Sequence, residues 1–220
     1  MRATSALSAF VVLGAALSTF GPSEGWAATV NASAGVGVAV RIQPSEPMET
    51  VYGRTQPLEV EARGGVWWQE RLGVGGLLGF SRRDGVGIGP GEELPATVLW
   101  QIPVAFEGRA RLALRDDQPV VPVIRGGLGV VVVHETWSGG STSEEGGWAA
   151  VKATAHIAGG AQIRLPFPEL GFGGPRFTTA RLPRAVYLQF EGRLRSAGDF
   201  GRKGLDLSDA GVVAGLTIWW

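Results

Sequence analysis

The side chains of this sequence that could take part in chemistry are carboxylates and guanidiniums, and most of them recur at every second position. They are Glu59, Glu61, Arg63, Glu107, Arg109, Arg125, Glu191 and Arg193. Two carboxylates on one face, such as Glu59 and Glu61, could act as an acid–base pair. Arginines stand close to them in the sequence, however, and this favours ion pairing over acid–base work. We therefore expect a structural polar network at these positions and no catalytic residues.

The sequence offers little else that could bind a metal, a cofactor or a nucleic acid. The two histidines, His134 and His156, have no converging partners at metal-site spacing, and the absence of cysteine excludes a thiolate site. The stretch GVGIGPG (85–91) lacks the lysine and the following helix of a phosphate loop, so it predicts a flexible loop. Lysine plus arginine equals aspartate plus glutamate at 20 each, which does not suggest a nucleic-acid partner.

A spacing of two residues is typical of a β-strand, whose side chains alternate between two faces. Eight alternating segments follow one another along the chain, with the charged residues on one face and an uncharged, mostly apolar face opposite. In the fourth segment, for example, the apolar face holds Val98, Trp100, Ile102, Val104 and Phe106. The segments are 30–42, 58–69, 72–81, 97–114, 120–133, 150–165, 185–195 and 209–220.

Such alternation fits both a soluble barrel or sandwich and a membrane barrel, in which the apolar face contacts lipid and the polar face lines the interior. Three further features favour the membrane barrel. Residues 1–27 have the basic start, short apolar stretch and small residues of a cleaved secretory signal. The polar face is rich in glycine, which suits a crowded interior. The final strand ends on an aromatic residue of the apolar face, Trp220.

The end of the chain, AGVVAGLTIWW, resembles the last strand of the small outer-membrane β-barrel proteins of Gram-negative bacteria, of the OmpA-transmembrane-domain, OmpX and OmpW kind. The residues that carry the resemblance are Val212, Ala214, Leu216, Ile218 and Trp220, and PVIRGGLGVVV (122–132) and AHIAGGAQIRL (155–165) also look like strands of this superfamily. The resemblance implies that residues 28–220 form an eight-stranded antiparallel up-and-down transmembrane barrel in the outer membrane. It further implies contact with outer-membrane lipids and recognition of the last strand by the barrel-assembly machinery.

Both ends of the mature chain are then expected in the periplasm, because the strand number is even. Outer loops are expected at 43–57, 82–96, 134–149 and 196–208, and inner turns near 70–71, at 115–119 and at 166–184. Pro103 and Pro122 remove ladder donors and predict a bulge or a local strand end. Trp68 and Trp220 are expected at the periplasmic interface, and Phe80 and Trp100 near the outer one.

The interior of an eight-stranded barrel is just wide enough to be filled by side chains. We expect salt bridges and trapped water there, with Glu61, Glu107 and Glu191 nearest to Arg125, and with long side chains reaching over the glycines of neighbouring strands. A plugged barrel with a structural or surface-interaction role through its outer loops follows from this. A narrow channel for ions or small solutes is the alternative.

Two other classes are less favoured. A lipid-modifying outer-membrane enzyme that attacks acyl chains from the bilayer side would need a serine and a histidine on the lipid-facing side, where the sequence predicts neither. A soluble periplasmic lipocalin-like binder would instead line its cavity with the apolar face.

Overall fold

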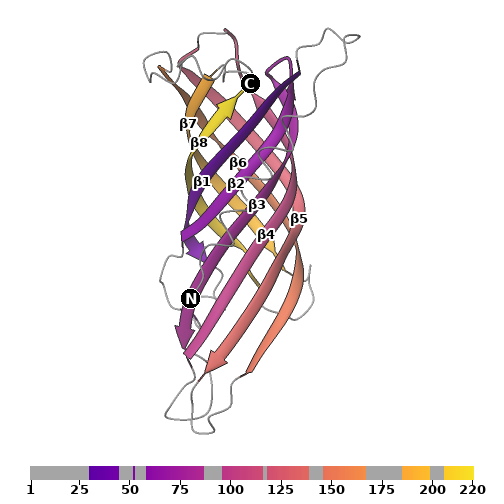
Figure 1. The fold of residues 1–220 in the computed structure, drawn as a ribbon, viewed down its shortest axis with the longest axis vertical. Helices are drawn as coiled ribbons and strands as arrows, with labels where there is room; N and C mark the ends of the chain where they lie inside the picture. The colour runs from indigo at the N-terminus through magenta and orange to yellow at the C-terminus, as the bar shows by residue number, and fades with distance from the viewer. Residues whose placement is uncertain are drawn as a thin grey trace, which may run out of the picture.

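The computed structural model describes residues 30–44, 52, 58–86, 96–115, 118–138, 146–166, 185–198 and 206–220. They form a closed barrel in which eight antiparallel strands follow one another in chain order (Figure 1). The strands are β1 (Val30–Pro44), β2 (Leu58–Trp68), β3 (Leu72–Val86), β4 (Ala96–Arg111), β5 (Val120–Ser138), β6 (Gly146–Leu165), β7 (Ala185–Ala197) and β8 (Asp209–Trp219). The predicted eight-stranded up-and-down barrel is confirmed. The predicted signal segment, 1–27, and most of the 166–184 connection lie outside the described residues.

The barrel closes where β1 pairs with β8, from Ser33 opposite Trp219 to Pro44 opposite Asp209. We call the end that holds Val30 and Trp219 the closing end; it is the upper end in Figure 1. The opposite end, where Leu58 and Asp209 begin their strands, is the distal end. Within the described ranges, no helix has the length and apolar character needed to cross a bilayer.

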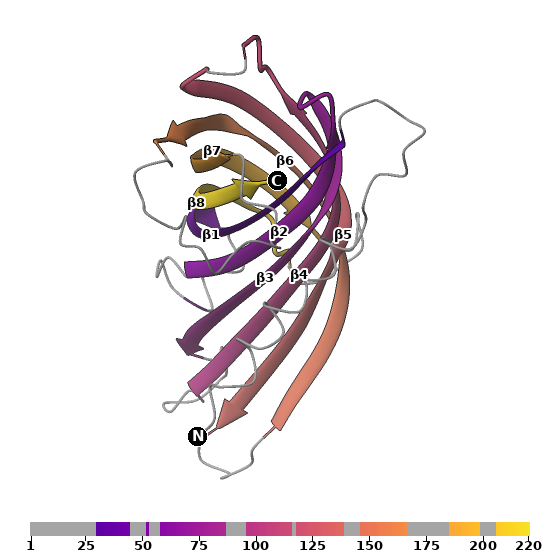
Figure 2. The ribbon, with the colours of Figure 1, turned by 45° about the horizontal axis from the view of Figure 1, so that its top comes forward.

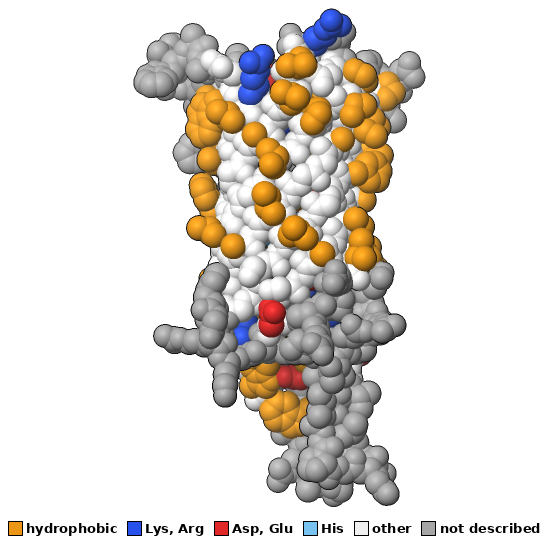
Figure 3. Space-filling view, turned by 180° about the vertical axis from the view of Figure 1, so that it is seen from behind, with side chains coloured by type: hydrophobic (Ala, Val, Ile, Leu, Met, Phe, Trp, Pro, Cys, Tyr) orange, Lys and Arg blue, Asp and Glu red, His pale blue; other side chains and the backbone are white. Residues whose placement is uncertain are grey.

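The wall has apolar side chains on its outside and charged side chains on its inside, which is the reverse of the arrangement in a soluble protein. On the outside, Leu128 is 70% exposed and Phe106 is 64% exposed, whereas Glu59 and Glu107 on the inside are fully buried. Figure 3 shows apolar side chains spread over the wall and charged side chains toward its ends. A lipocalin-like binder would place the apolar face inside, so this arrangement contradicts the soluble alternative.

Several strands extend further than the sequence predicts. β3 continues to Val86, β5 continues to Ser138, and β6 begins at Gly146, so parts of the expected loops 82–96 and 134–149 belong to the wall. The β5–β6 ladder reaches Trp137 opposite Gly146, while the β6–β7 ladder stops at Thr154 opposite Ala197. Strands β3 to β6 therefore extend further than β7 and β8 at the distal end, as Figure 2 shows. We call this extension, which includes residues 82–86, 134–138 and 146–153, the raised wall.

Of the bulge or local strand end expected at each strand proline, neither proline shows a bulge, and a strand end lies beside Pro122 only. At Pro103 the β3–β4 ladder is interrupted between Leu78–Val104 and Ser81–Gln101, but the register on both sides is the same, so no residue is inserted. Pro122 pairs with Ala161 without interruption. Its other neighbour, β4, has already ended at Arg111, and so the missing donor of Pro122 breaks no β4–β5 ladder bond. The register shift that the strands do contain lies in β1, between Arg41 and Gln43.

Candidate functional site: the charged interior

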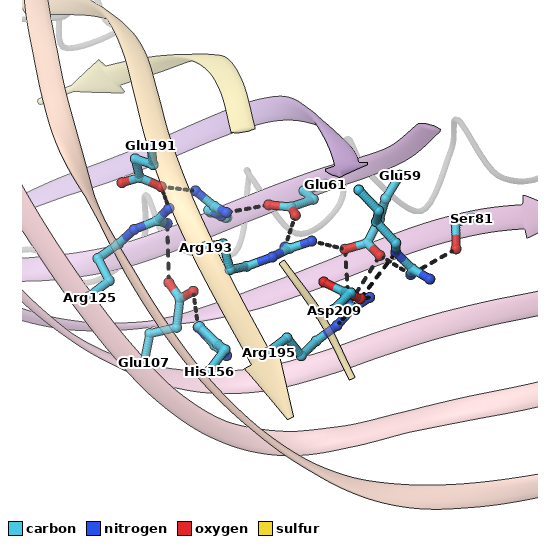
Figure 4. Close-up of polar contacts among 12 residues, drawn as sticks. Glu59, Glu61, Ser81, Glu107, Arg125, His156, Glu191, Arg193, Arg195 and Asp209 are labelled. Carbon is cyan, nitrogen blue, oxygen red and sulfur yellow. Dashed lines mark hydrogen bonds and ion pairs between the residues drawn. The ribbon is translucent and has the colours of Figure 1, made fainter. Parts of the chain in front are cut away.

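A continuous network of ion pairs and hydrogen bonds occupies the middle of the barrel and receives a side chain from every strand (Figure 4). Its distal part centres on Glu59. One carboxylate oxygen of Glu59 lies 2.6 Å from Nη2 of Arg41 and 3.1 Å from Nη1 of Arg195. Asp209 of β8 pairs with the same two arginines, with Oδ2 at 2.5 Å from Arg195 Nη2 and 3.3 Å from Arg41 Nε.

The central part of the network joins β2 to β7. Arg193 bridges the two acids of β2, with Nη2 at 3.1 Å from Oε1 of Glu59 and a second contact to Glu61. Arg63 pairs with Glu61 on its own strand and, across the interior, with Oε2 of Glu191 at 3.1 Å. Alternation along each strand puts residues two apart on one face, which is why Glu59, Glu61 and Arg63 all point inward.

The part nearest the closing end centres on Glu107. Arg109 donates from Nε to Oε2 of Glu107 at 3.0 Å, and Nε2 of His156 lies 3.0 Å from the other oxygen. Arg125 contacts Glu191 and lies 3.6 Å from Glu107, whereas no ion pair joins it to Glu61 among the described residues. Of the three acids expected nearest Arg125, two are therefore its partners.

Glycines on β2 and β3 make room for the long side chains of β4. A Cβ atom on Gly75 would lie 2.6 Å from Cζ of Arg109, and one on Gly65 would lie 2.9 Å from its Nη1. Real Cβ atoms do not approach other atoms this closely, so Arg109 can lie across these positions only because both are glycine. This arrangement matches the expected reach of charged side chains over glycine-rich neighbours.

The structure brings all eight residues of the predicted network into one interior cluster, and it adds residues that the sequence analysis did not include. The additions are Arg41, Ser81, His156, Arg195 and Asp209. Each lies on the polar face of its strand. Alternation along the sequence predicts that face for Arg41, His156 and Arg195, although the predicted network did not include them.

An apolar cluster lies inside the closing end. Trp67, Val121, Ala185, Tyr187 and Trp219 pack together there, and each is at most 7% exposed. The guanidinium of Arg111 stacks on them, with Cζ 3.9 Å from the centroid of the Trp219 ring and 4.9 Å from that of Tyr187. Trp219 therefore points inward, and Trp220, which follows the strand, donates its backbone N–H to Ala32 at 3.1 Å. We call this set the closing cluster.

A second apolar cluster lies inside the distal end. It consists of Tyr52, Leu99, Val131, Val133, Ala197 and Leu207, and Trp148 packs against it. The hydroxyl of Tyr52 donates to Oε1 of Glu135 at 2.5 Å, and the indole of Trp148 donates to the same carboxylate. Burial and this hydrogen bond raise the pKa of Tyr52, so its hydroxyl stays protonated as a donor. The polar network thus lies between two apolar clusters.

The geometry favours ion pairing over acid–base or metal chemistry. Every carboxylate of the network contacts at least one guanidinium. Among the described residues, no group of three or more metal-ligating side chains converges on one point. His134 lies in β5 and is exposed on the outer face, contrary to both the predicted loop position and the expectation of no histidine there. It stands opposite Trp100 and Ala149, neither of which is a nucleophile.

A closed antiparallel barrel with an apolar outer wall and a paired, charged interior is a transmembrane barrel of the outer-membrane type. No protein-family model matches the sequence, and no curated protein matches it. Among solved structures, it is similar to the attachment invasion protein Ail of Yersinia pestis, in complex with the heparin analogue sucrose octasulfate, with a TM-score of 0.49 and 14% identity over 87% of this chain and 99% of that one.

Two further structures share the architecture at lower similarity. Neisserial surface protein A has a TM-score of 0.42 and 10% identity, covering 86% of this chain and 95% of that chain. OprG of Pseudomonas aeruginosa has a TM-score of 0.43 and 9% identity, covering 88% and 96%. The closed strand order of this chain, with its apolar outer face and charged inner face, defines its class independently of these similarities.

Removal of Arg125 tests the interior network. Arg125→Ala leaves Glu191 with one cation fewer in a buried site and is expected to lower the free energy of unfolding by about 3–5 kcal/mol. Adding Glu191→Gln should recover part of the loss, whereas adding Glu61→Gln should not, because Glu61 does not pair with Arg125. Urea unfolding of the refolded barrel measures all three variants. Equal recovery by both second substitutions would contradict the pairing described here.

The two terminal tryptophans are expected to differ in their effect on stability. Trp219→Ala removes a 3% exposed ring from the closing cluster and should lower the free energy of unfolding by about 3–5 kcal/mol. Trp220→Ala, outside the cluster and partly exposed, should lower it by about 1 kcal/mol or less. Denaturant unfolding of the refolded barrel in detergent gives both values. A larger effect for Trp220 would mean that the inward and outward assignments are reversed.

Proposed function

We propose that this chain is an integral outer-membrane protein of a Gram-negative cell, with its closing end in the periplasm and its distal end at the cell surface. Connection length supports this orientation, because outer-membrane barrels have short periplasmic turns and longer outer loops. β2 and β3 are joined at the closing end by the tight turn 69–71. Longer segments, 45–57 and 87–95, separate strands at the distal end, although 166–184 is a long connection at the closing end.

The outer wall and the last strand support the partners of this proposal. Outer-membrane lipids would contact the exposed apolar side chains. Phe80 and Trp100 lie on the outer wall toward the distal end, with their ring centroids 5.4 Å apart. Arg82 extends over the Trp100 ring at 5.1 Å, which suits an interface between apolar and polar surroundings. On the outward face of β8, Val212, Ala214, Leu216 and Ile218 precede Trp220, and we propose that the barrel-assembly machinery reads this set.

The observation that carries the functional proposal is the filled interior. Paired charges occupy the middle of the barrel and apolar clusters occupy both ends, so we propose a closed, non-conducting barrel with a structural or surface-interaction role. The raised wall supports the surface role, since β6 begins at Gly146 whereas its ladder with the described part of β7 ends at Thr154 opposite Ala197. Such an edge can pair with an added strand. We propose no enzymatic activity, because the network acids are ion-paired.

Chemical labelling tests the proposed orientation. The chain contains no cysteine, so a single introduced thiol reports one position. Ser141→Cys, in the connection that follows the raised wall, should react with a membrane-impermeant maleimide on intact cells. The matched variant Gln118→Cys, in the 115–119 turn at the closing end, should react only after the outer membrane is permeabilised.

If intact cells label Gln118→Cys but not Ser141→Cys, the proposed orientation is wrong and the closing end lies at the cell surface. Single-channel recording of the same refolded variants in planar bilayers checks the closed interior. Steady conductance of the unlabelled barrel would favour the narrow channel over the plugged barrel.

A further inference from the structure

The apolar cluster inside the distal end contains one aromatic ring that does not belong to the barrel wall. Tyr52 lies in the connection between β1 and β2, whereas the residues that pack with it include Leu99 of β4 and Val131 of β5. Tyr52 is nonetheless only 3% exposed. Connecting segments normally run over the surface of a protein. The burial of this ring therefore indicates that the wall forms a specific site for it.

The wall around the ring offers both an apolar surface and a hydrogen-bond acceptor. Glu135 pairs with Leu99 of β4 on one side and with Trp148 of β6 on the other, so the three residues form one row across neighbouring strands. Oε1 of Glu135 accepts from the Tyr52 hydroxyl at 2.5 Å, and the other oxygen accepts from the indole of Trp148. We call these residues the ring site: Leu99, Val131, Val133, Glu135 and Trp148.

The ring site lies where β6 extends beyond its ladder with β7. Val131 and Val133 pair with residues 152 and 150 of β6, whereas the described β6–β7 ladder ends at Thr154. Both valines are nevertheless at most 1% exposed. Since Tyr52 packs in the same cluster, its ring supplies cover that the shorter strands do not.

The distal part of the ion-pair network lies next to this cluster. Ala197 of the cluster is two residues from Arg195 on β7, and Leu207 is two residues from Asp209 at the start of β8. Arg195 and Asp209 pair with each other, and both side chains are at most 3% exposed. Entry of water at this end would weaken the pair, because the effective dielectric constant would rise.

We propose that Tyr52, by occupying the ring site, closes the distal end of the interior to water and small solutes. The site recognises a phenol, because its apolar side chains pack with the ring and Glu135 accepts from the hydroxyl. Tyr52 belongs to no strand, so its removal opens the site without breaking a ladder bond. The inference rests on the proposed closed interior and names the side chain that closes it at the distal end.

A buried reporter thiol tests this closure. Ser81→Cys is nearly isosteric, and Ser81 is 1% exposed and accepts a hydrogen bond from Arg41 of the network. With Tyr52 in place, the thiol of the refolded full barrel should react slowly with a water-soluble methanethiosulfonate. Adding Tyr52→Ala should raise the rate at least about tenfold, because loss of a buried aromatic ring costs more than the free energy of one factor of ten.

A ring removed from the opposite end provides the matched control. Adding Trp219→Ala to Ser81→Cys should leave the labelling rate unchanged, since Trp219 lies in the closing cluster. An unchanged rate with Tyr52→Ala, or an equal increase with Trp219→Ala, would overturn the closure by Tyr52. Both of these results would leave the closed interior standing, whereas rapid labelling with Tyr52 in place would contradict the closed interior and the closure together.

Two further measurements test recognition of the hydroxyl. Tyr52→Phe keeps the ring but loses the hydrogen bond to Glu135, so its labelling rate should lie between those of the native residue and Tyr52→Ala. In the Tyr52→Ala barrel, para-cresol should slow labelling again, and toluene, which lacks the hydroxyl, should slow it less. Equal protection by the two compounds, or a native rate for Tyr52→Phe, would overturn the phenol site.

Discussion

Pairing of buried charges is the constraint on which this structure depends. A guanidinium or carboxylate inside a barrel surrounded by lipid is unfavourable unless an opposite charge and hydrogen bonds compensate it. Glu59 accepts from three arginines on three other positions of the wall, and Glu191 joins Arg63 of β2 to Arg125 of β5. Because these pairs span the interior, they hold strands together that are not neighbours in the sheet.

The rest of the interior follows from that network. Glycines at positions 65 and 75 leave the space in which Arg109 reaches Glu107, and an apolar cluster lies beyond the charges at each end of the barrel. Burial of these side chains strengthens each ion pair, since the effective dielectric constant falls. Arg111 is part of the closing cluster, where aromatic faces contact a cation that has few other partners.

The sequence was sufficient to predict the strands and their faces because both depend on a period of two. It also identified the eight charged residues that meet inside, since strong alternation leaves no other face for Glu107 or Arg193. Prediction was poorer for the ends of the strands. The raised wall contains residues such as Arg82, Asp84 and His134, whose polar character suggests loops, and pairing between neighbouring strands stabilises them as strand instead.

The apolar clusters could not be read from the sequence in the same way. Val131 and Val133 lie inside while Val130 and Val132 lie outside, and all four have the same side chain. Composition carries no signal in such a run, but alternation along the strand predicts the outer face for Val130 and Val132, and likewise for Trp220 at the end of the chain. What alternation could not predict is that inward residues of different strands, such as Leu99 and Val131, pack together with Tyr52.

That valine run also offers the most direct measurement of the central claim, which is that the apolar face contacts lipid and the charged face fills the interior. Methyl-labelled barrel in deuterium-exchanged water and protonated detergent can be examined for nuclear Overhauser effects between valine methyls and detergent acyl chains. Val130 and Val132 should show these contacts, and Val131 and Val133 should show none. Acyl-chain contacts at Val131 and Val133, with none at Val130 and Val132, would contradict the account.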